Sequence, residues 1–316
     1  MQYITGLEQY KEKAGSAVTL GKFDGLHRGH RKLVERVMEH VEEETDLKSV
    51  VCFFDMTEFK ARMHLDGKKL MTNAERAFRL ENRVDYLVEC PFLSVKEMEA
   101  EQFIEQILCG VFHAKYIVVG ENFRFGHERR GDTEMLKKYA KRYGYTIEVM
   151  ENEMYGSRVV SSTYVREVMK TGDMYLVNRL LSYPYTIAGT VVKGDQQGRE
   201  MGSPTMDIIP CEEKILPPKG TYICKIRSGG DWYQGVCNIG TKPTVAQNEE
   251  RTLSAHLFCY EEKEEVYGRE IIVQLYQYLR PERKFADVHA LKNQIQDDIR
   301  EGKRYFFQVA NRGRNR

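Results

Sequence analysis

Two hydrophobic patterns divide the chain. In the first half, short runs rich in β-branched residues alternate with stretches whose hydrophobic residues recur at helical spacing. The strand-like runs are AVTLG at 17–21, KSVVCFF at 48–54 and YIVVG at 116–120. Helical patterns begin near Arg28 and pass through AERAFRL and TEMLKKYAKRYG. This alternation predicts βαβ units built around a parallel sheet.

The second half carries a different pattern, and the change falls near Pro184. Short strand-like runs (YTIAGTVV, TYICKI, YQGVCNIG, TLSAHLF and EIIVQLY) are separated there by clusters of Gly, Pro, Asn and Asp. Such spacing predicts a small antiparallel barrel or sandwich. Near the C-terminus, Val288, Leu291, Ile295 and Ile299 recur at helical spacing and predict a helix. We therefore expect two domains, 1–183 and 184–316.

Charge and composition narrow the class of protein. The 316 residues include 48 Lys and Arg against 47 Asp and Glu, and 41% are hydrophobic. This balance argues against a dedicated nucleic-acid binder and against a disordered chain. We find neither a signal-like start nor a run of about 20 apolar residues, so we expect a cytoplasmic protein without a membrane partner. Seven scattered cysteines without a C-x-x-C pair argue against disulfides and zinc.

The most informative segment is GKFDGLHRGH, from Gly21 to His30, which follows the first predicted strand and opens a predicted helix. Free backbone N–H groups and the positive end of the helix dipole favour phosphate at such a junction. His27 and His30 lie three residues apart, so both imidazoles can donate to phosphoryl oxygens. A metal pair is the alternative, which lacks an acidic third ligand at a familiar spacing.

Two further segments carry candidate chemistry. VVSSTYVREVMKTGD places hydroxyl groups at a predicted helix start, with an arginine one turn later; it is either an ordinary N-cap or a second phosphate cradle. VVGENFRFGHERRGD follows a strand and is either an ordinary strand end or a holder for a planar ring. The candidate residues of these two segments are Ser161, Ser162, Thr163 and Arg166, and then Asn122, Phe123, Arg124 and Phe125.

These three motifs, in this order, resemble the nucleotidyltransferase module of bacterial bifunctional riboflavin kinase/FAD synthetases. The second half resembles that family's kinase module through YPYTIAGTVVKGDQQGREMGSPT, PPKGTY, YQGVCNIGTKPT and LRPERKF. The resemblance covers almost the whole chain. It implies an α/β Rossmann-like nucleotidyltransferase domain over 1–183, with helices on both faces of its sheet. It also implies a small antiparallel β-barrel with a terminal helix over 184–316.

The resemblance also implies activity and site residues. AMP would pass from ATP to FMN with release of pyrophosphate, and riboflavin would be phosphorylated by ATP, with Mg²⁺ as the cofactor. His27, His30 and Arg166 would be catalytic, and Asn122, Phe123, Arg124 and Phe125 would bind the flavin. The implied ATP-binding residues of the first module are Gly21, Phe23, Asp24, Gly25, Gly29, Ser161, Ser162 and Thr163. In the kinase module, Gly198, Gly202 and Thr205 would hold ATP phosphates, and Thr205 with Asp207 would bind Mg²⁺.

The sequence departs from the family pattern at three places. Asp55, Met56 and Thr57 replace a T-F-x-P-H-P-like segment and alter one wall of the first site. In the kinase module, Asp207 stands where the family has Asn in P-T-A-N. Ser254 stands where the family has a glutamate general base in a strand resembling T-x-E-x-H. A serine hydroxyl cannot take a proton from the riboflavin hydroxyl near neutral pH, so the kinase chemistry is expected to be impaired.

Three functions remain open from the sequence. The chain is a bifunctional enzyme, or an FMN adenylyltransferase whose degenerate kinase module only binds flavin, or a non-catalytic flavin- or nucleotide-sensing paralogue. A different nucleotidyltransferase would share H-x-G-H but would leave FRFG and the barrel-like half unexplained. The oligomeric state is not encoded in any of these patterns.

Overall fold

The computed structural model describes residues 1–193, 206–228, 230–243, 249–258 and 266–314. It contains two compact units, Met1–Tyr164 and Val165–Arg316. The division lies inside helix α7 (Ser162–Thr171), whereas the change in composition suggested a boundary after residue 183, which stays a sequence prediction. We describe each unit by itself.

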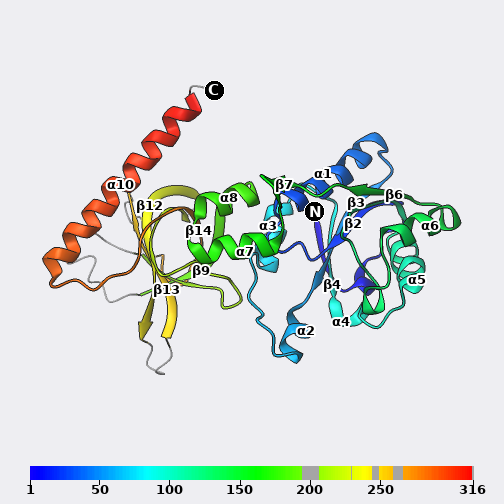
Figure 1. The fold of residues 1–316 in the computed structure, drawn as a ribbon, viewed down its shortest axis with the longest axis horizontal. Coiled ribbons are helices and arrows are strands. Elements are labelled where there is room, and N and C mark those ends of the chain that lie inside the picture. Colours follow the sequence, from blue (N-terminus) through cyan, green and yellow to red (C-terminus); the bar gives the residue numbers. More distant parts are fainter. Residues whose placement is uncertain (194–205, 229, 244–248, 259–265, 315–316) are drawn as a thin grey trace. The chain divides into compact units, whose positions relative to one another are not determined.

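Unit 1 is built on a six-stranded sheet in which every pairing is parallel (Figure 1). The strand order is β1-β4-β3-β2-β5-β6, and the central strands are almost wholly buried because their sequences are continuous apolar runs. The strands are β1 (Gln2–Thr5), β2 (Ser16–Gly21), β3 (Lys48–Asp55), β4 (Tyr86–Pro91), β5 (Ala114–Gly120) and β6 (Thr146–Met150). A separate hairpin consists of β7 (Met154–Tyr155) and β8 (Arg158–Val159).

The helices of unit 1 start and stop where local chemistry dictates. Thr72 and Glu75 form a capping box at the start of α3. Asp132 caps α6, and Gly144 ends it in the left-handed conformation. The helical elements are η1 (Leu7–Gln9), α1 (Arg28–Glu43), α2 (Thr57–Arg62), α3 (Asn73–Leu80), α4 (Phe92–Val95), α5 (Ala100–Gln102), the π-helical η2 (Phe103–Val111), η3 (His127–Arg129) and α6 (Thr133–Tyr143).

The strand order reverses at β2. The chain passes from β2 to β3 on one side, and it later returns to place β5 against the other side. In open α/β sheets, ligands bind outside the carboxyl ends of the strands at such a switch point. The segments that follow β2 and β5 are the glycine-rich turn and the Asn122–Phe125 segment. The topology therefore brings two of the sequence motifs to neighbouring strand ends.

Unit 2 is a closed antiparallel barrel in the order β10-β13-β12-β11-β14-β9. Alternate residues point inward, as in β9, where Tyr185, Ile187 and Val191 are buried. The strands are β9 (Tyr185–Val192), β10 (Met206–Pro210), β11 (Gly220–Ser228), β12 (Asp231–Pro243), β13 (Glu249–Leu257) and β14 (Glu270–Arg280). Helix α8 (Met174–Leu181) packs against β14 and β9.

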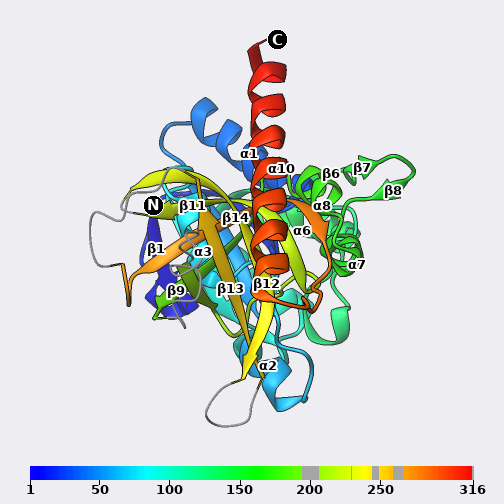
Figure 2. The same ribbon diagram turned by 90° about the vertical axis from the view of Figure 1, so that its left-hand side faces the viewer.

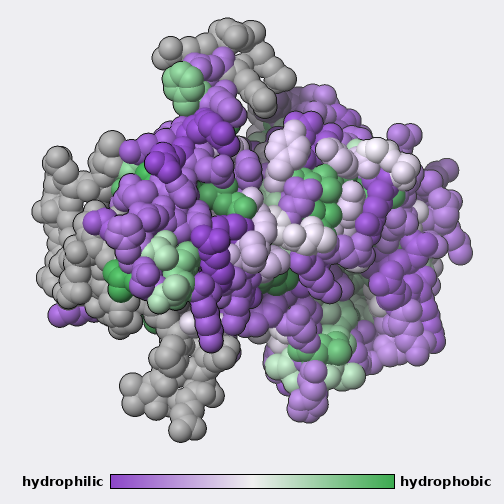
Figure 3. Space-filling model, turned by 60° about the vertical axis from the view of Figure 1, so that its left-hand side comes forward, coloured by the Kyte–Doolittle hydropathy of each residue, from purple (hydrophilic) through white to green (hydrophobic). Residues whose placement is uncertain are grey.

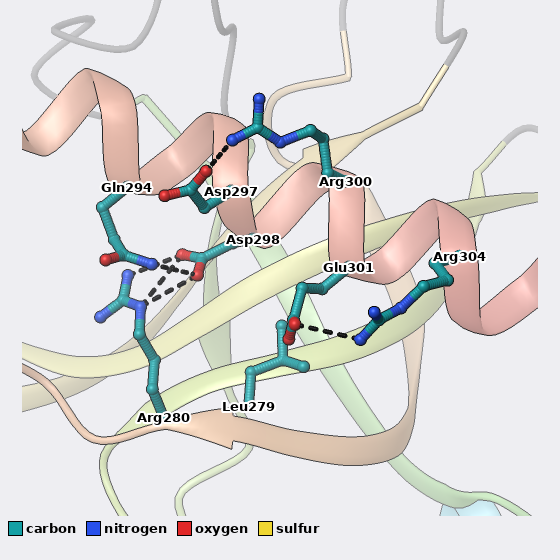
Figure 4. A pocket seen from close by; sticks show the side chains of 8 residues that line it. All are labelled: Leu279, Arg280, Gln294, Asp297, Asp298, Arg300, Glu301 and Arg304. Atoms are coloured by element: carbon teal, nitrogen blue, oxygen red, sulfur yellow. Dashed lines mark hydrogen bonds and ion pairs between the residues drawn. The ribbon is translucent and has the colours of Figure 1, made fainter.

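The C-terminal helix α10 (Val288–Arg314) lies against the outside of the barrel beside β12, as Figure 2 shows. Ile299 and Phe306 of α10 pack with Ile223, Val236 and Phe258 of the barrel side. On the same stretch of the helix, a polar pocket of about 540 Å³ lies between α10 and the end of β14 (Figure 4). Its lining residues are Leu279, Arg280, Gln294, Asp297, Asp298, Arg300, Glu301 and Arg304.

The architecture confirms the fold class expected from the sequence: a parallel α/β sheet, then a closed antiparallel barrel and a terminal helix. The barrel resolves the choice between barrel and sandwich that the strand spacing left open. Across the described ranges, no helix is both long and apolar enough to cross a membrane. The face seen in Figure 3 is mainly hydrophilic, with hydrophobic residues gathered in small patches.

Candidate active sites

The turn between β2 and α1 has an unusual backbone. Phe23 and Leu26 have φ values of 46° and 39°, and Gly25 between them has φ of 89°. Positive φ is costly for side chains such as Phe and Leu, and it persists only where the surroundings enforce it. Here both side chains are fully buried, at 0% and 2% exposed, so burial offsets the strain. The buried side chains therefore fix the conformation of the turn that precedes α1.

The two predicted histidines meet at the start of α1. Their rings are stacked, with centroids 3.7 Å apart and an angle of 21° between planes. His27 is 7% exposed, and among the described residues the Nδ1 atoms of His27 and His30 have no hydrogen-bond partner. The first turn of α1 contains no acidic residue. Two unpartnered ring nitrogens at a helix N-terminus form a site suited to an anion.

Both imidazoles are neutral at physiological pH. Burial lowers the pKa of His27 to about 4, against a smaller opposing effect of Asp24. Burial also lowers the pKa of His30 well below its usual value, with further contributions from His27 and Arg76. A neutral imidazole donates from one nitrogen and accepts at the other. The pair can thus donate hydrogen bonds to phosphoryl oxygens without bringing a fixed positive charge.

Arg76 of α3 is a site residue that the sequence analysis missed. It is 3% exposed, its Nε lies 3.4 Å from the carbonyl oxygen of Phe23, and its guanidinium stacks 4.0 Å above the Phe53 ring. Arg76 thereby holds the carbonyl group of the strained turn and places a cation near His30. Position 76 lies 53 residues after Phe23 in an ordinary helical pattern, and nothing in that pattern marks it.

Asp24, predicted to bind ATP, makes contacts that shape the turn. Its Oδ1 accepts hydrogen bonds from the backbone N–H groups of Leu70 at 2.8 Å and Met71 at 3.4 Å. Its carbonyl oxygen accepts a 2.7 Å hydrogen bond from the hydroxyl of Ser162. The first and second sequence motifs are thus in direct contact through Ser162 and Asp24.

The second motif begins α7. Ser161 Oγ accepts from the backbone N–H of Tyr164 at 3.2 Å, which is an N-cap contact, so the capping role predicted as one alternative is present. Thr163 lies in the first turn of α7, and Arg166 lies one turn after Ser162 within unit 2. The phosphate contacts of these residues stay predictions.

The third motif follows β5. The rings of Phe123 and Phe125 stack at 5.6 Å, and Phe125 is 5% exposed in the main core. Arg124 is exposed and donates to the Phe123 carbonyl at 2.8 Å. Asn122 Nδ2 lies 3.3 Å from Asn152 Oδ1. Phe125 therefore anchors the segment, and Asn122, Phe123 and Arg124 lie nearer to solvent.

Lys22, the residue after β2, lies within electrostatic reach of two other cations and of the Asp24 carboxylate. Partial burial of its side chain lowers the pKa of Lys22, and repulsion from Arg129 and Lys60 lowers it further. Lys22 directly follows β2, Lys60 lies in α2 after β3, and Arg129 lies in η3 after β5. Like charges held within electrostatic reach of one another favour an anionic ligand. The sequence analysis did not identify this cluster, because the three lie far apart in the chain.

The DMT departure has a local structural role. Asp55 ends β3, and its carboxylate accepts hydrogen bonds from Thr57 N at 2.6 Å and Asn73 Nδ2 at 2.6 Å. Lys69 lies 3.4 Å away. Burial raises the pKa of Asp55, but the hydrogen bonds from Thr57 and Asn73 outweigh burial and hold it at about 2. Asp55 thus ties the start of α3, and so Arg76, to the strand end.

In unit 2, Asp207 and Ser254 face each other on neighbouring strands. They are register partners in the β10–β13 pairing, and Ser254 Oγ donates to Asp207 Oδ1 at 2.5 Å. Gly198, Gly202 and Thr205 lie outside the described residues. Within the described ranges, no three His, Cys, Asp or Glu side chains are grouped to hold a metal ion.

The parallel sheet with its switch point at β2, followed by a glycine-rich turn and a helix that begins beside two stacked histidines, is typical of nucleotide-transferring α/β domains. A family profile described as FAD synthetase matches residues 9–164, and one described as riboflavin kinase matches residues 181–306. The chain belongs to the bifunctional riboflavin kinase/FMN adenylyltransferase family, as the resemblance of its motifs implied.

Curated relatives of that name span nearly the whole chain. The Haemophilus influenzae protein is 32% identical over 314 residues, covering 97% of this chain and 99% of its own length. The Bacillus subtilis protein is 33% identical over 302 residues, covering 94% of each. A solved Streptococcus pneumoniae chain described as a macrolide-efflux protein has a TM-score of 0.81 at 23% identity, covering 94% of this chain and 97% of its own. That last likeness shows the fold alone.

Proposed function

We propose that unit 1 transfers AMP from ATP to FMN, forming FAD and releasing pyrophosphate. The observation that carries this proposal is the stacked pair of neutral histidines, with unpartnered Nδ1 atoms, at the start of α1. The FMN phosphate attacks the α-phosphorus of ATP, and the two imidazoles donate hydrogen bonds to the oxygens on which negative charge builds. No covalent intermediate is needed, because the protein's task is alignment.

The surrounding residues take supporting roles in this proposal. Gly21, Gly25 and Gly29 let phosphate approach the backbone, and Ser161, Ser162, Thr163 and Arg166 hold the remaining phosphates. The Lys22, Lys60 and Arg129 cluster attracts both anionic substrates. Asn122, Phe123 and Arg124 line the flavin side, and Phe125 supports them from the core.

Mg²⁺ fits this scheme as a substrate-bound ion. The described residues offer no cluster of three ligands, and Mg²⁺ at nucleotide sites is commonly held by one or two protein oxygens together with phosphates and water. It would neutralise charge on the phosphate chain. We also expect this chemistry in the cytoplasm, with small-molecule substrates and no nucleic acid.

For unit 2 we propose riboflavin phosphorylation by ATP, giving FMN and ADP. The support is the family barrel together with a carboxylate, Asp207, that lies within hydrogen-bond reach of the position where the family has its base. A unit that binds flavin without phosphorylating it is the second candidate, because Ser254 itself is not a base.

A two-substrate assay tests both halves. The purified full chain is incubated with ATP and Mg²⁺ and with either riboflavin or FMN, and the flavins are separated by chromatography. FAD from both substrates is the expected result. FAD from FMN alone would reduce unit 2 to a binding module. The absence of FAD in both reactions, with flavin retained by the purified protein, would contradict catalysis and support a sensing role.

A further inference from the structure

Arg76 of α3 is a buried cation beside the proposed phosphate site. Its Nε donates to the Phe23 carbonyl oxygen at 3.4 Å, its Nη1 donates to Asn73 Oδ1 at 2.9 Å, and its central carbon lies 4.0 Å from the centroid of the Phe53 ring. The residue is 3% exposed, and burial lowers the pKa of Arg76 against an opposing effect of Asp24. Burying a charge is costly, so a guanidinium at this depth needs a reason.

The Phe23 residue connects Arg76 to the two imidazoles. Phe23 has a φ of 46°, and the carbonyl oxygen that Arg76 binds also closes the turn by accepting from the Leu26 N–H at 3.4 Å. The ring of Phe23 contacts His30, with centroids 4.9 Å apart, and the ring of His30 stacks on His27. Closely packed side chains move together. A change in the orientation of the Phe23 peptide should therefore displace its ring and, through that ring, both imidazoles.

Arg76 is itself anchored from the end of β3. Asn73, which holds Nη1 of Arg76, donates from Nδ2 to Asp55 at 2.6 Å. Asp55 belongs to the segment in which the chain departs from the family pattern. Just before α3, the backbone N–H of Leu70 donates to Asp24 of the turn at 2.8 Å. The stretch of chain that ends at Arg76 thus ties the turn to the strand end.

We propose, on the basis of the adenylyl transfer assigned to unit 1, that Arg76 is a positioning residue for this reaction. It fixes the Phe23 peptide and thereby holds the two imidazoles in the orientation from which they donate to the oxygens of the reacting phosphorus. Asp55 acts through Asn73 to hold Arg76 in place. Donors of this kind must be aimed before the reaction begins, and a misplacement of about 1 Å can cost about 10²-fold in rate.

A packing role is the competing interpretation, and two substitutions separate it from positioning. Arg76→Met should keep the contact with the Phe53 ring while it removes the charge and both donors, and such a change often leaves stability unchanged or raises it. Arg76→Lys keeps the charge and one donor but loses the planar fork. A positioning role therefore gives the lysine variant the higher rate. A packing role gives the methionine variant a rate at least equal to that of the lysine variant.

The test measures initial rates of FAD formation from FMN and ATP in the full chain, together with urea unfolding followed by circular dichroism. Arg76→Met should lower kcat by about 10²-fold, with the KM for FMN and for ATP within about threefold of wild type. Its urea midpoint for unit 1 should be unchanged or raised. Arg76→Lys should keep kcat within about tenfold of wild type. The matched control is Arg83→Met, at an exposed arginine shortly after α3, which should match wild type.

A double-mutant cycle tests the link to β3. Asn73→Ala removes the amide that holds Nη1 of Arg76 and should lower kcat by about tenfold. In the Arg76→Met background the same substitution should change kcat by less than about twofold, because no guanidinium is left to hold. Losses that multiply in the double variant would show that Asn73 acts independently of Arg76, and would remove the anchoring role of Asp55.

Other results would overturn the positioning role. A wild-type kcat in Arg76→Met, or a kcat that follows the urea midpoint across the variants at this position, would assign Arg76 to packing alone. Wild-type protein that forms no FAD from FMN would contradict the adenylyl transfer itself, which is distinct from normal FAD formation by Arg76→Met. If Arg76→Met does not fold, Arg76→Lys and Asn73→Ala still decide the question, because wild-type rates in both would contradict the proposal.

Discussion

The two units position their chemical groups in different ways. In unit 1 the candidate residues lie on segments that follow strand ends, where a strained turn and a helix start hold His27 and His30. In unit 2 the pair Asp207 and Ser254 lies within the strands, so the register of the barrel sets their separation. A loop site depends on distant supports such as Arg76, whereas a strand site can accept a change if its cross-strand neighbour also changes. This difference explains how altered residues can coexist with an intact family fold.

The largest expected effect is on unit 1. His27→Ala removes one of the two donors of the proposed phosphate site and should lower the kcat for FAD formation from FMN by about 10²- to 10³-fold. Riboflavin phosphorylation in the same preparation should be lowered far less, because unit 2 uses its own groups. Chromatographic rates on both substrates measure the contrast.

The matched control for this prediction is His64→Asn. His64 is exposed and has a positive φ of 51°, a conformation that Asn tolerates. It should leave both rates near wild type. FAD formation at the wild-type rate by His27→Ala would contradict the role given to the imidazole pair.

The second-largest expected effect is a loss of stability of unit 1 at acid pH, through His27. His27 has a pKa of about 4 in the folded protein and about 6.5 when exposed, so the unfolded chain binds more protons between these values. The stabilising effect of its neutral form is complete above pH 6.5 and is lost as the pH falls toward 4. The difference of about 2.5 pKa units corresponds to about 3 kcal/mol at most.

The corresponding measurement is urea unfolding followed by circular dichroism at pH 7 and pH 4.5. The unfolding transition of unit 1 should lose about 2 to 3 kcal/mol more in wild type than in His27→Gln over this interval. His64→Asn should keep the wild-type loss. Equal losses in wild type and His27→Gln would show that His27 is not held neutral by burial.

Much of the fold followed from the sequence, because hydrophobic periodicity is a local signal. The strand runs and the start of α1 near Arg28 lie where the patterns placed them. The histidine pair was also visible, since three residues of helix bring the rings together. Arg76 and the Asp207–Ser254 pair were not, because their partners lie 53 and 47 residues away and depend on strand order and register. Contacts between residues so far apart leave no local pattern in a single sequence.

The smallest expected effect compares two aspartates that are adjacent in α10 of unit 2 (Figure 4). Asp298 is 5% exposed and receives Arg280 Nη2 at 2.7 Å, Arg280 Nε at 3.0 Å and Gln294 Nε2 at 2.9 Å. Asp297 pairs with Arg300 at the surface.

Asp298→Asn should lower the free energy of unfolding of unit 2 by about 2 kcal/mol, because the half-buried guanidinium of Arg280 loses its anionic partner. Asp297→Asn should cost less than about 0.5 kcal/mol, because both members of its exposed ion pair with Arg300 are solvated by water. Trp232, the one tryptophan in the sequence, lies in unit 2 and reports its unfolding by fluorescence. Equal costs for the two variants would mean that the Arg280–Asp298 pair does not fasten α10 to β14.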